Sequence, residues 1–360
     1  QDDVSVGAVG TMSLGPVMLD LEGTALTAPE RELLRHPLVG GVILFSRNYA
    51  DPEQLEALLA EIHALRQPRL LVAVDHEGGR VQRFRDGFSH LPPARAFGDI
   101  YQRDRRRARH LAETCGWVMA AELRAVGVDF SFAPVLDLDR DISRVIGDRA
   151  FHRDPETVGD LARAYIRGMH HAGMAATGKH FPGHGGVEAD SHKALPVDER
   201  EYADLSLEDM LPYERLLEDL AGVMPAHVVY PRIDPEPAGF SPFWLQEVLR
   251  RRLGFQGIIF SDDLDMEGAR AAGGFVERAE AARAAGCDMV LVCNNRRGAE
   301  QVLDGLRVGE DPLLHARLAR MHGKPAPDRE ALHRDRRWRE ASELLWRFAD
   351  NPSLDLELGA

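Results

Sequence analysis

The feature that most constrains the fold is an alternation of short apolar runs with longer amphipathic segments along most of the chain. The runs are rich in Val, Ile, Leu and Phe and do not alternate between polar and apolar residues. This pattern is typical of strands that are buried on both faces of a parallel sheet. The predicted strands span residues 17–21, 41–45, 70–75, 128–134, 175–180, 223–229, 257–261 and 289–293.

The segments between these runs have apolar residues spaced three and four apart, which predicts amphipathic helices. Several of them follow Asp, Ser or Thr, the residues that cap helix N-termini. The predicted helices span residues 52–65, 105–125, 155–172, 207–220, 242–252, 276–285 and 298–308. Eight strands that alternate with helices predict an α/β fold, a closed (β/α)8 or TIM barrel in a single domain. A doubly wound open sheet is the alternative, but the glycine pairs at 40–41 and 78–79 do not form a G-x-G-x-x-G phosphate loop.

The length of 360 residues suits one barrel with extended loops. We expect the catalytic barrel to occupy residues 12–325. Residues 326–360 are charged and carry a helical pattern without a strand, so we expect a helical extension that packs on the barrel. Residues 1–11 are interpreted as an added or disordered segment, with Met12 as the natural start.

Composition excludes several classes of function. A formal net charge of -14 argues against nucleic acid as a partner, because a phosphate backbone requires a basic surface. The basic run 103–109 is interpreted as a solvated helix face. No run of about 18 apolar residues exists, so no membrane span is expected. The three cysteines, Cys115, Cys287 and Cys293, form no disulfide framework and favour a reduced, cytoplasmic location.

Polar residues follow the ends of several predicted strands. In a barrel these ends converge on the face where active sites lie, so we expect the side chains to meet there. They are Asp75, Asp137, Asp139, Lys179, His180, His227, Asp262 and Asp263.

Asp262 follows a buried run directly, in the sequence Ser261-Asp262-Asp263-Leu264. A carboxylate held on rigid backbone at this position suits a nucleophile that attacks an anomeric carbon. An Asp pair at the start of a helix is also a common N-cap. Taken alone, the cap is the commoner interpretation.

The segment 179–192 contains three His, one Lys and two acidic residues within fourteen positions. A metal site is one interpretation of such a cluster. The adjacent cation of Lys179 and the absence of an H-E-x-x-H spacing argue against it, so neither a metal nor another cofactor is expected. The Asp190-x-His192 pair suits proton transfer, because a carboxylate that orients an imidazole supports acid/base chemistry near neutral pH.

The segment that begins at Asp75 reads D-H-E-G-G-R-V-Q-R. The carboxylate of Asp75 is suited to accept hydrogen bonds from neighbouring sugar hydroxyls, and Arg80 and Arg83 are suited to donate to oxygens. A surface loop of salt bridges is the alternative interpretation.

Together these motifs resemble glycoside hydrolase family 3, and in particular its single-domain bacterial β-N-acetylglucosaminidases of peptidoglycan recycling. The resemblance covers residues 17–294 and rests on K-H-F-P-G-H-G, D-S-H and F-S-D-D-L in that order, with D-x-E-G-G-R-V-Q-R upstream. It implies that Asp262 is the nucleophile, that His192 is the acid/base, and that Asp190 is the partner of His192. It also implies sugar-binding positions at Asp75, Arg83, Arg149, Lys179 and His180, with Met224 on a segment that lines the pocket.

The resemblance further implies a retaining β-N-acetylhexosaminidase that removes terminal N-acetylglucosamine from muropeptide fragments carrying anhydro-muramic acid. We expect a monomer. In this chain His76 replaces the usual Gln of the family pattern, for which modest tuning is expected. Many family 3 β-glucosidases have a second domain that supplies an acid/base Glu, and we do not expect such a domain in this chain. A β-glucosidase-type hydrolase, an N-acetylglucosamine phosphorylase, a metallohydrolase and a sugar-binding barrel without activity remain alternatives.

Overall fold

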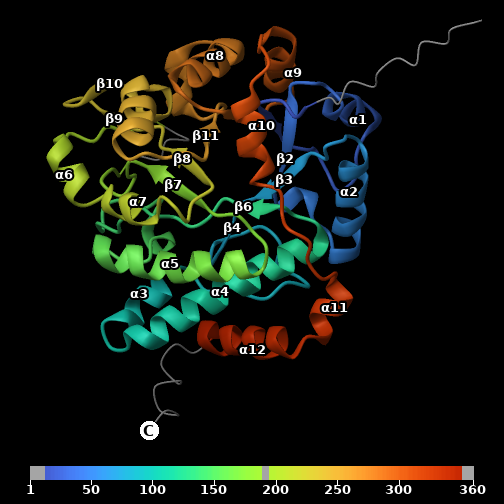
Figure 1. Cartoon of the computed structure of the whole chain (residues 1–360), viewed down its shortest axis with the longest axis vertical. Coiled ribbons are helices and arrows are strands. Elements are labelled where there is room, and N and C mark those ends of the chain that lie inside the picture. Colours follow the sequence, from blue (N-terminus) through green and yellow to red (C-terminus); the bar gives the residue numbers. More distant parts are fainter. Residues whose placement is uncertain (1–12, 189–193, 351–360) are drawn as a thin grey trace, which may run out of the picture.

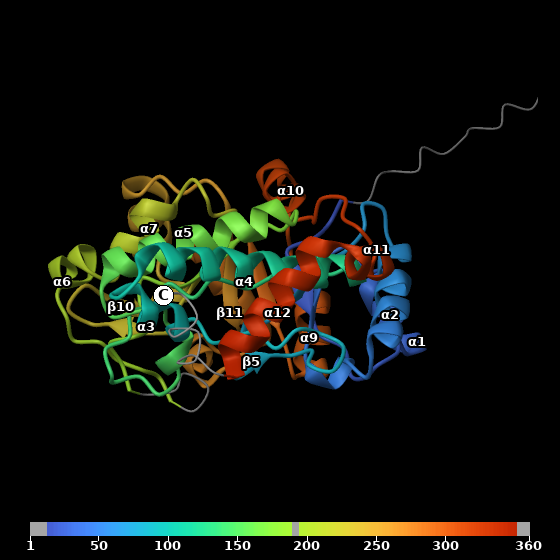
Figure 2. The ribbon, with the colours of Figure 1, turned by 90° about the horizontal axis from the view of Figure 1, so that it is seen from below.

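Eight parallel strands form the centre of the computed structural model, which describes residues 13–188 and 194–350. Helices surround these strands in both views of the ribbon (Figures 1 and 2). In their order along the sheet the strands are β6 (Phe130–Ser131), β3 (Leu71–Val74), β2 (Val39–Leu44), β1 (Val17–Leu19), β12 (Met289–Val292), β11 (Ile258–Asp263), β8 (Gly222–Pro225) and β7 (Thr177–Phe181). Each coincides with one of the predicted strands.

The two edge strands of this sheet, β6 and β7, are joined through the residues that follow β6. Val135 pairs with Lys179 in a parallel bridge. The amide of Thr177 donates to the carbonyl of Ala133 at 2.9 Å, and the amide of Leu136 donates to the carbonyl of Lys179 at 2.7 Å. These contacts close the sheet, so the predicted (β/α)8 barrel is confirmed.

Aromatic rings fill the interior of the barrel. Phe130, Phe132 and Phe260 are fully buried, and their ring centroids lie 5.1 to 5.6 Å apart. The interior is therefore a packed core rather than a channel. Functional side chains are confined to the ends of the strands.

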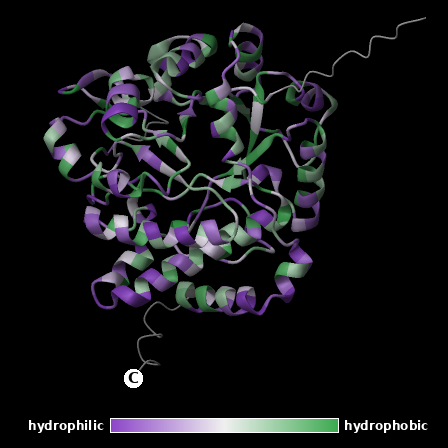
Figure 3. Ribbon diagram, viewed as in Figure 1, coloured by the Kyte–Doolittle hydropathy of each residue, from purple (hydrophilic) through white to green (hydrophobic). Residues whose placement is uncertain are grey.

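The helices are amphipathic, and Figure 3 shows hydrophobic and hydrophilic residues interleaved along the peripheral helices. Asp51, Asp104 and Asp154 cap α2, α4 and α5 by accepting from backbone amides of the first turn. Gly127 ends α4 in the left-handed conformation with φ of 105°. The α-helices are α1 (Ala28–Leu34), α2 (Pro52–Ala64), α3 (Arg95–Tyr101), α4 (Arg105–Val126), α5 (Pro155–His171), α6 (Tyr202–Leu207), α7 (Leu211–Leu216), α8 (Phe275–Ala285), α9 (Arg296–Gly305), α10 (Pro312–Ala319), α11 (Arg329–Arg334) and α12 (Arg336–Asp350).

Two predicted helices differ from the structure. The helix predicted over 207–220 is wrong in its extent, because α6 ends at Leu207 and only α7, from Leu211 to Leu216, lies within the predicted range. Pro212 lies in the first turn of α7, and a proline starts a helix more readily than it continues one because it has no amide hydrogen. The segment predicted over 242–252 is a π-helix, η4 (Phe243–Arg252). Short 3-10 helices complete the structure: η1 (Ser46–Asn48), η2 (Gly147–Arg149), η3 (Ala238–Phe240) and η5 (Glu267–Ala272).

The C-terminal helices α11 and α12 lie beside α4 (Figure 2). Leu345 and Phe348 of α12 are buried in the same hydrophobic core as the barrel, and the ring of Phe348 stacks on Phe97 of α3 at 5.9 Å. A boundary at residue 325 remains a prediction. No helix of the described residues has the length and the apolar character that crossing a bilayer demands.

Two hairpins follow strands at the carboxyl end of the barrel. β4 (His76–Gly78) and β5 (Val81–Gln82) pair antiparallel directly after β3. β9 (Val229–Tyr230) and β10 (Asp234–Pro237) pair antiparallel after β8. The first hairpin places Asp75 between β3 and β4, at the mouth of the barrel.

Candidate active site

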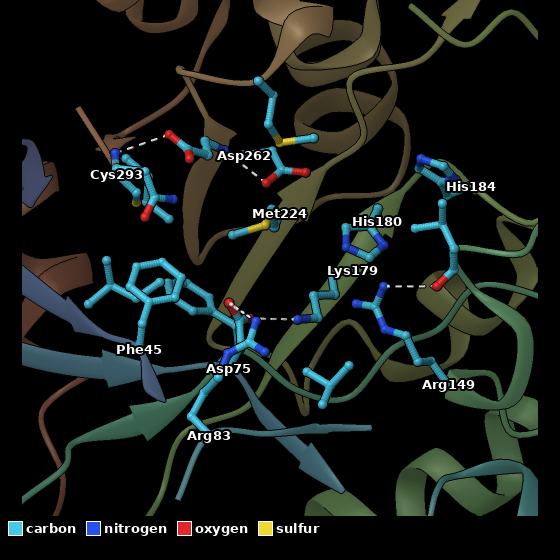
Figure 4. A pocket seen from close by; sticks show the side chains of 18 residues that line it. Phe45, Asp75, Arg83, Arg149, Lys179, His180, His184, Met224, Asp262 and Cys293 are labelled. Atoms are coloured by element: carbon cyan, nitrogen blue, oxygen red, sulfur yellow. Dashed lines mark hydrogen bonds and ion pairs between the residues drawn. The ribbon is translucent and has the colours of Figure 1, made fainter. Parts of the chain in front are cut away.

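A cavity of about 180 Å³ opens at the carboxyl ends of the strands (Figure 4). It is smaller than the roughly 300 to 1,000 Å³ of pockets for drug-sized ligands, so it suits a small polar ligand. Its lining residues are Ile43, Phe45, Asp75, Val81, Arg83, Phe132, Val145, Arg149, Lys179, His180, His184, Met224, Asp262, Asp263, Met266, Leu291, Cys293 and Asn294.

Seven residues predicted from the sequence line this one cavity, although they come from different elements. They are Asp75 and Arg83 beside the β4–β5 hairpin, Arg149 in η2, Lys179 and His180 in β7, Met224 in β8 and Asp262 in β11. The predicted acid/base His192 and its partner Asp190 lie outside the described residues.

Four charged side chains form a network along one wall of the cavity. The ammonium of Lys179 donates to Oδ1 of Asp75 at 2.9 Å and lies 2.8 Å from Oε1 of Glu77. Arg149 donates to the same Glu77 through Nε at 2.9 Å and Nη2 at 2.8 Å. Three segments that are distant in the sequence are therefore tied together by fixed, charge-assisted hydrogen bonds.

The environment keeps this network charged. Burial alone lowers the pKa of Lys179, but the carboxylates of Asp75 and Glu77 raise it above its ordinary value. Burial alone raises the pKa of Glu77, but the cations of Arg149 and Lys179 hold it well below its ordinary value. The cavity wall thus offers fixed charges to polar groups of a ligand.

The second oxygen of Asp75 is less engaged than the first. Nη2 of Arg83 lies 4.0 Å from this oxygen, Oδ2. The guanidinium of Arg83 also lies over the ring of Phe45, 5.9 Å from its centroid. Oδ2 of Asp75 is therefore the oxygen that a ligand hydroxyl would approach.

His180 is held from behind by a buried carboxylate. Nδ1 of its ring lies 2.7 Å from Oδ2 of Asp137. Asp137 also accepts from the backbone amide of His184 at 2.8 Å. The rings of His180 and His184 meet edge to face, with centroids 5.8 Å apart. Asp137 thereby fixes both the ring of His180 and the backbone that leads to His184.

Asp262 and Asp263 end β11, and Asp262 faces the cavity in Figure 4. The amide of Asp263 donates to Oδ1 of Asp262 at 2.8 Å. Oδ1 of Asp263 in turn accepts the amides of Asp265 at 3.0 Å and Cys293 at 3.1 Å. Burial raises the pKa of Asp263 to about 7. Two adjacent carboxyl groups therefore occupy different environments, which is the usual way to give them different tasks.

Sequence reasoning did not assign roles to Glu77, Asp137 and His184. Glu77 lies two residues after Asp75, and residues two apart on extended backbone face the same side, which is a signal that could have singled it out. The sequence marks Asp137 only as a polar residue at the end of a predicted strand. His184 lies within the K-H-F-P-G-H-G motif, but the motif does not state which of its histidines lines the cavity.

Within the described residues, no group of three or more His, Cys, Asp or Glu side chains is arranged to hold a metal ion. Asp190 and His192 are not among the residues covered by that statement. The chemistry that the described wall supports is hydrogen bonding to a polar ligand, together with attack by a carboxylate.

A family profile and similar proteins of known name match most of the length of this chain. The profile of the glycosyl hydrolase family 3 N-terminal domain matches residues 11–322. A β-hexosaminidase of Thioalkalivibrio sulfidiphilus is 62% identical over 96% of this chain and 100% of that protein. A β-hexosaminidase of Nitrosospira multiformis is 60% identical over 88% of this chain and 91% of that protein.

Solved structures of family 3 enzymes are also similar to this chain in sequence and in fold. The crystal structure of NagZ from Neisseria gonorrhoeae in complex with N-trifluoroacetyl-D-glucosamine is 46% identical, with a TM-score of 0.89, over 94% of this chain and 98% of that chain. A family 3 β-N-acetylglucosaminidase from Paenibacillus is 30% identical, with a TM-score of 0.82, over 93% of this chain and 68% of that chain. The chain therefore belongs to glycoside hydrolase family 3.

Proposed function

We propose that this protein is a retaining exo-β-N-acetylglucosaminidase in which Asp262 is the nucleophile and His192 is the acid/base. The observation that carries the proposal is the position of Asp262. Its carboxylate ends a rigid barrel strand and shares one cavity with Asp75, Arg149, Lys179 and His180. A sugar held by those polar groups would present its anomeric carbon to a carboxylate that needs no rearrangement to attack.

The reaction proceeds in two displacements. Asp262 attacks the anomeric carbon while an acid protonates the leaving oxygen, and a covalent glycosyl-enzyme forms. The same acid, now a base, takes a proton from water, which attacks the anomeric carbon and releases Asp262. Two inversions give net retention. We assign the acid/base role to His192, with Asp190 as the carboxylate that orients it; both assignments rest on the D-S-H motif.

Sugar binding is assigned to the charged wall. Oδ2 of Asp75, which lies 4.0 Å from Arg83, is suited to accept from a hydroxyl. Lys179 and Arg149 are suited to donate to sugar oxygens, because both remain charged beside Glu77. Met224 lines the cavity and is suited to pack against a pyranose ring.

The sugar class is supported by the relatives. The similar β-hexosaminidases and NagZ, whose crystal structure holds an N-acylated glucosamine, favour N-acetylglucosamine over glucose. Muropeptide fragments that carry anhydro-muramic acid are the proposed natural substrates. A monomer in the cytoplasm is the proposed form, which agrees with three cysteines that are buried and free.

The nucleophile is tested with Asp262→Ala and an aryl β-N-acetylglucosaminide. We expect kcat to fall at least about a thousandfold, as for loss of other enzymatic nucleophiles. Asp304→Ala, on the exposed side of α9, is the matched control and should retain full activity. Turnover by Asp262→Ala close to that of the unmodified protein would refute the assignment.

The covalent intermediate is tested by intact-mass spectrometry after incubation with a 5-fluoro-N-acetylglucosaminyl fluoride. We expect one added sugar on the peptide that contains Asp262, and none in Asp262→Ala. An adduct on another residue would show that this other residue is the nucleophile. Parallel assays of the aryl glucoside distinguish sugar classes: faster cleavage of the glucoside would favour a β-glucosidase.

A further inference from the structure

Asp137 has no direct role in the proposed chemistry, yet it is a fully buried acid in contact with His180, which lines the cavity. Its Oδ1 accepts the amide of His184 at 2.8 Å, and both of its oxygens lie 3.2 Å from the amide of His180. Its Oδ2 lies 2.7 Å from Nδ1 of the His180 ring. The contacts with the two backbone amides require Asp137 to accept, whereas the direction of the contact with the His180 ring depends on which group carries the hydrogen.

An ionised carboxylate has no hydrogen to donate, so the charge of Asp137 decides the direction of the contact with His180. Burial alone raises the pKa of Asp137, but the imidazole of His180 and the amide of His184 hold that pKa below its ordinary value. The hydrogen of the 2.7 Å contact must then be on Nδ1 of His180.

The other ring nitrogen of His180 is the polar ring atom left for the cavity that His180 lines (Figure 4). Within the described part of the chain, Nε2 of His180 has no hydrogen-bond partner. In a neutral imidazole with a hydrogen on Nδ1, Nε2 carries a lone pair and accepts. Asp137, on the other side of the ring, therefore determines whether Nε2 of His180 donates or accepts a hydrogen bond in the cavity.

We propose that Asp137 is a positioning residue that locks neutral His180 with its hydrogen on Nδ1, so that Nε2 accepts a hydrogen bond from one hydroxyl of the bound sugar. This inference rests on the proposed sugar-binding function and deepens it. The site then selects ligands that carry a hydroxyl donor at that position and discriminates against ligands with only an acceptor there.

Substitution of Asp137 by Asn is expected to reverse this polarity. Oδ1 keeps the amide of His184, so the new amide nitrogen takes the place of Oδ2 and donates to Nδ1 of His180. The ring hydrogen then moves to Nε2, which becomes a donor to the cavity. The same exchange in the Ser-His-Asp triad preserves geometry and produces the wrong tautomer.

The tautomer is measured directly by 15N NMR of the unmodified protein at pH 8 with 15N-labelled histidine. His180→Gln identifies the His180 signals by their absence. We expect a protonated Nδ1 and an unprotonated Nε2. A hydrogen on Nε2, alone or on both nitrogens, overturns the proposal. This test does not require the Asp137 variant to fold.

Specificity is measured by competitive inhibition with N-acetylglucosamine and its 3-, 4- and 6-deoxy and deoxyfluoro analogues. Fluorine accepts weakly and does not donate, so at the hydroxyl that faces His180 both analogues should bind about ten- to a hundredfold more weakly than the parent sugar. In Asp137→Asn the fluoro analogue at that position should regain at least about threefold over the deoxy analogue. Asp304→Asn, on the exposed side of α9, should leave the ratio unchanged.

The two proposals fail in different ways. If N-acetylglucosamine does not inhibit and its aryl glycoside is not cleaved, the proposed function fails, whereas the NMR result still decides the tautomer. If the parent sugar binds but no position changes its fluoro-to-deoxy ratio in Asp137→Asn, the role of Asp137 is refuted while the function stands.

Discussion

Glu77 and Arg149 are joined by two hydrogen bonds, of 2.9 Å from Nε and 2.8 Å from Nη2. The pair links the hairpin after β3 to the 3-10 helix η2, and Lys179 of β7 adds a contact at 2.8 Å to the same carboxylate. Glu77 is therefore the common anchor of two cations that the proposed function assigns to sugar binding.

Glu77→Gln should weaken the enzyme and the fold together. The amide removes the negative charge that holds Arg149 and Lys179, and breaking a buried pair from one side typically costs about 3 to 5 kcal/mol. We expect a fall of at least about a hundredfold in kcat/KM, mainly through KM, and a loss of about 3 kcal/mol in the free energy of unfolding. Steady-state kinetics and urea unfolding measure the two effects. Glu330→Gln, an exposed partner of Arg334, should change neither, and an unchanged KM in Glu77→Gln would contradict the anchoring role.

Asp263 should make the protein less stable as pH rises. Burial raises its pKa to about 7 from an ordinary value of 3.8, so between pH 4 and 7 the folded state binds a proton that the unfolded chain does not bind. Stability then decreases with pH across this window. Asp263→Asn keeps Oδ1 as acceptor for the amides of Asp265 and Cys293 but does not titrate. Relative to the unmodified protein, the variant should gain about 1 kcal/mol per pH unit over the window. Urea unfolding at pH 5, 6, 7 and 8 tests this, and parallel stability curves would exclude it.

His76 should make the protein less stable as pH falls. Burial, with the cations of Arg83 and Arg85 nearby, lowers its pKa to about 3 from an ordinary value of 6.5. Below pH 6.5 the unfolded chain binds a proton that the folded state does not bind, so stability decreases as pH falls. His76→Gln should therefore gain stability over the unmodified protein at pH 5 but not at pH 7.5, and kcat/KM at pH 7.5 should stay within about threefold. Thermal unfolding at both pH values is the measurement. His110→Gln, which replaces an exposed histidine, should show no such gain.

Phe348 tests whether the C-terminal helix unfolds with the barrel. The side chain is 1% exposed and stacks on Phe97, so Phe348→Ala should lower the free energy of unfolding by about 3 to 5 kcal/mol. Trp346, two residues earlier on the same helix, is 58% exposed, and Trp346→Ala should change stability by only about 0.5 kcal/mol. Circular dichroism during urea unfolding follows the loss of helix, and the loss of activity follows the barrel. The two transitions should coincide if the helix and the barrel unfold together. A separate early transition for the helix, with the barrel unchanged, would argue for two independent units.

The strands were predictable because their signal is local. Strands such as β2 and β3 are fully buried, and burial on both faces requires a continuous apolar run that any reader of the sequence can see. The helices were less uniform. The period of residues 207–220 is helical, but the chain breaks between α6 and α7, and Pro212 lies in the first turn of the second helix. Short helices such as α1 and α3 have too few turns for a periodic pattern to be visible.

The site was predictable only in part, for a related reason. Residues at strand ends share a barrel face, so Asp75, Lys179 and Asp262 could be grouped without coordinates. The contact of Asp137 with His180 spans 43 positions, and that of Glu77 with Arg149 spans 72. Only tertiary structure brings such pairs together, and one sequence carries no signal for them. Asp190 and His192 remain predictions.

The wall of the cavity joins Asp75 to Lys179 across 104 positions of the chain. The residues that line the cavity come from strands and loops throughout the barrel, so only the folded chain forms the cavity. A ligand that fills it therefore binds the folded state alone. Occupancy adds RT ln(1 + [L]/Kd) to the free energy of unfolding, so a hundredfold excess of sugar over its Kd would supply about 2.7 kcal/mol. Through this linkage, the concentration of the sugar itself becomes a determinant of the fraction of enzyme that is folded.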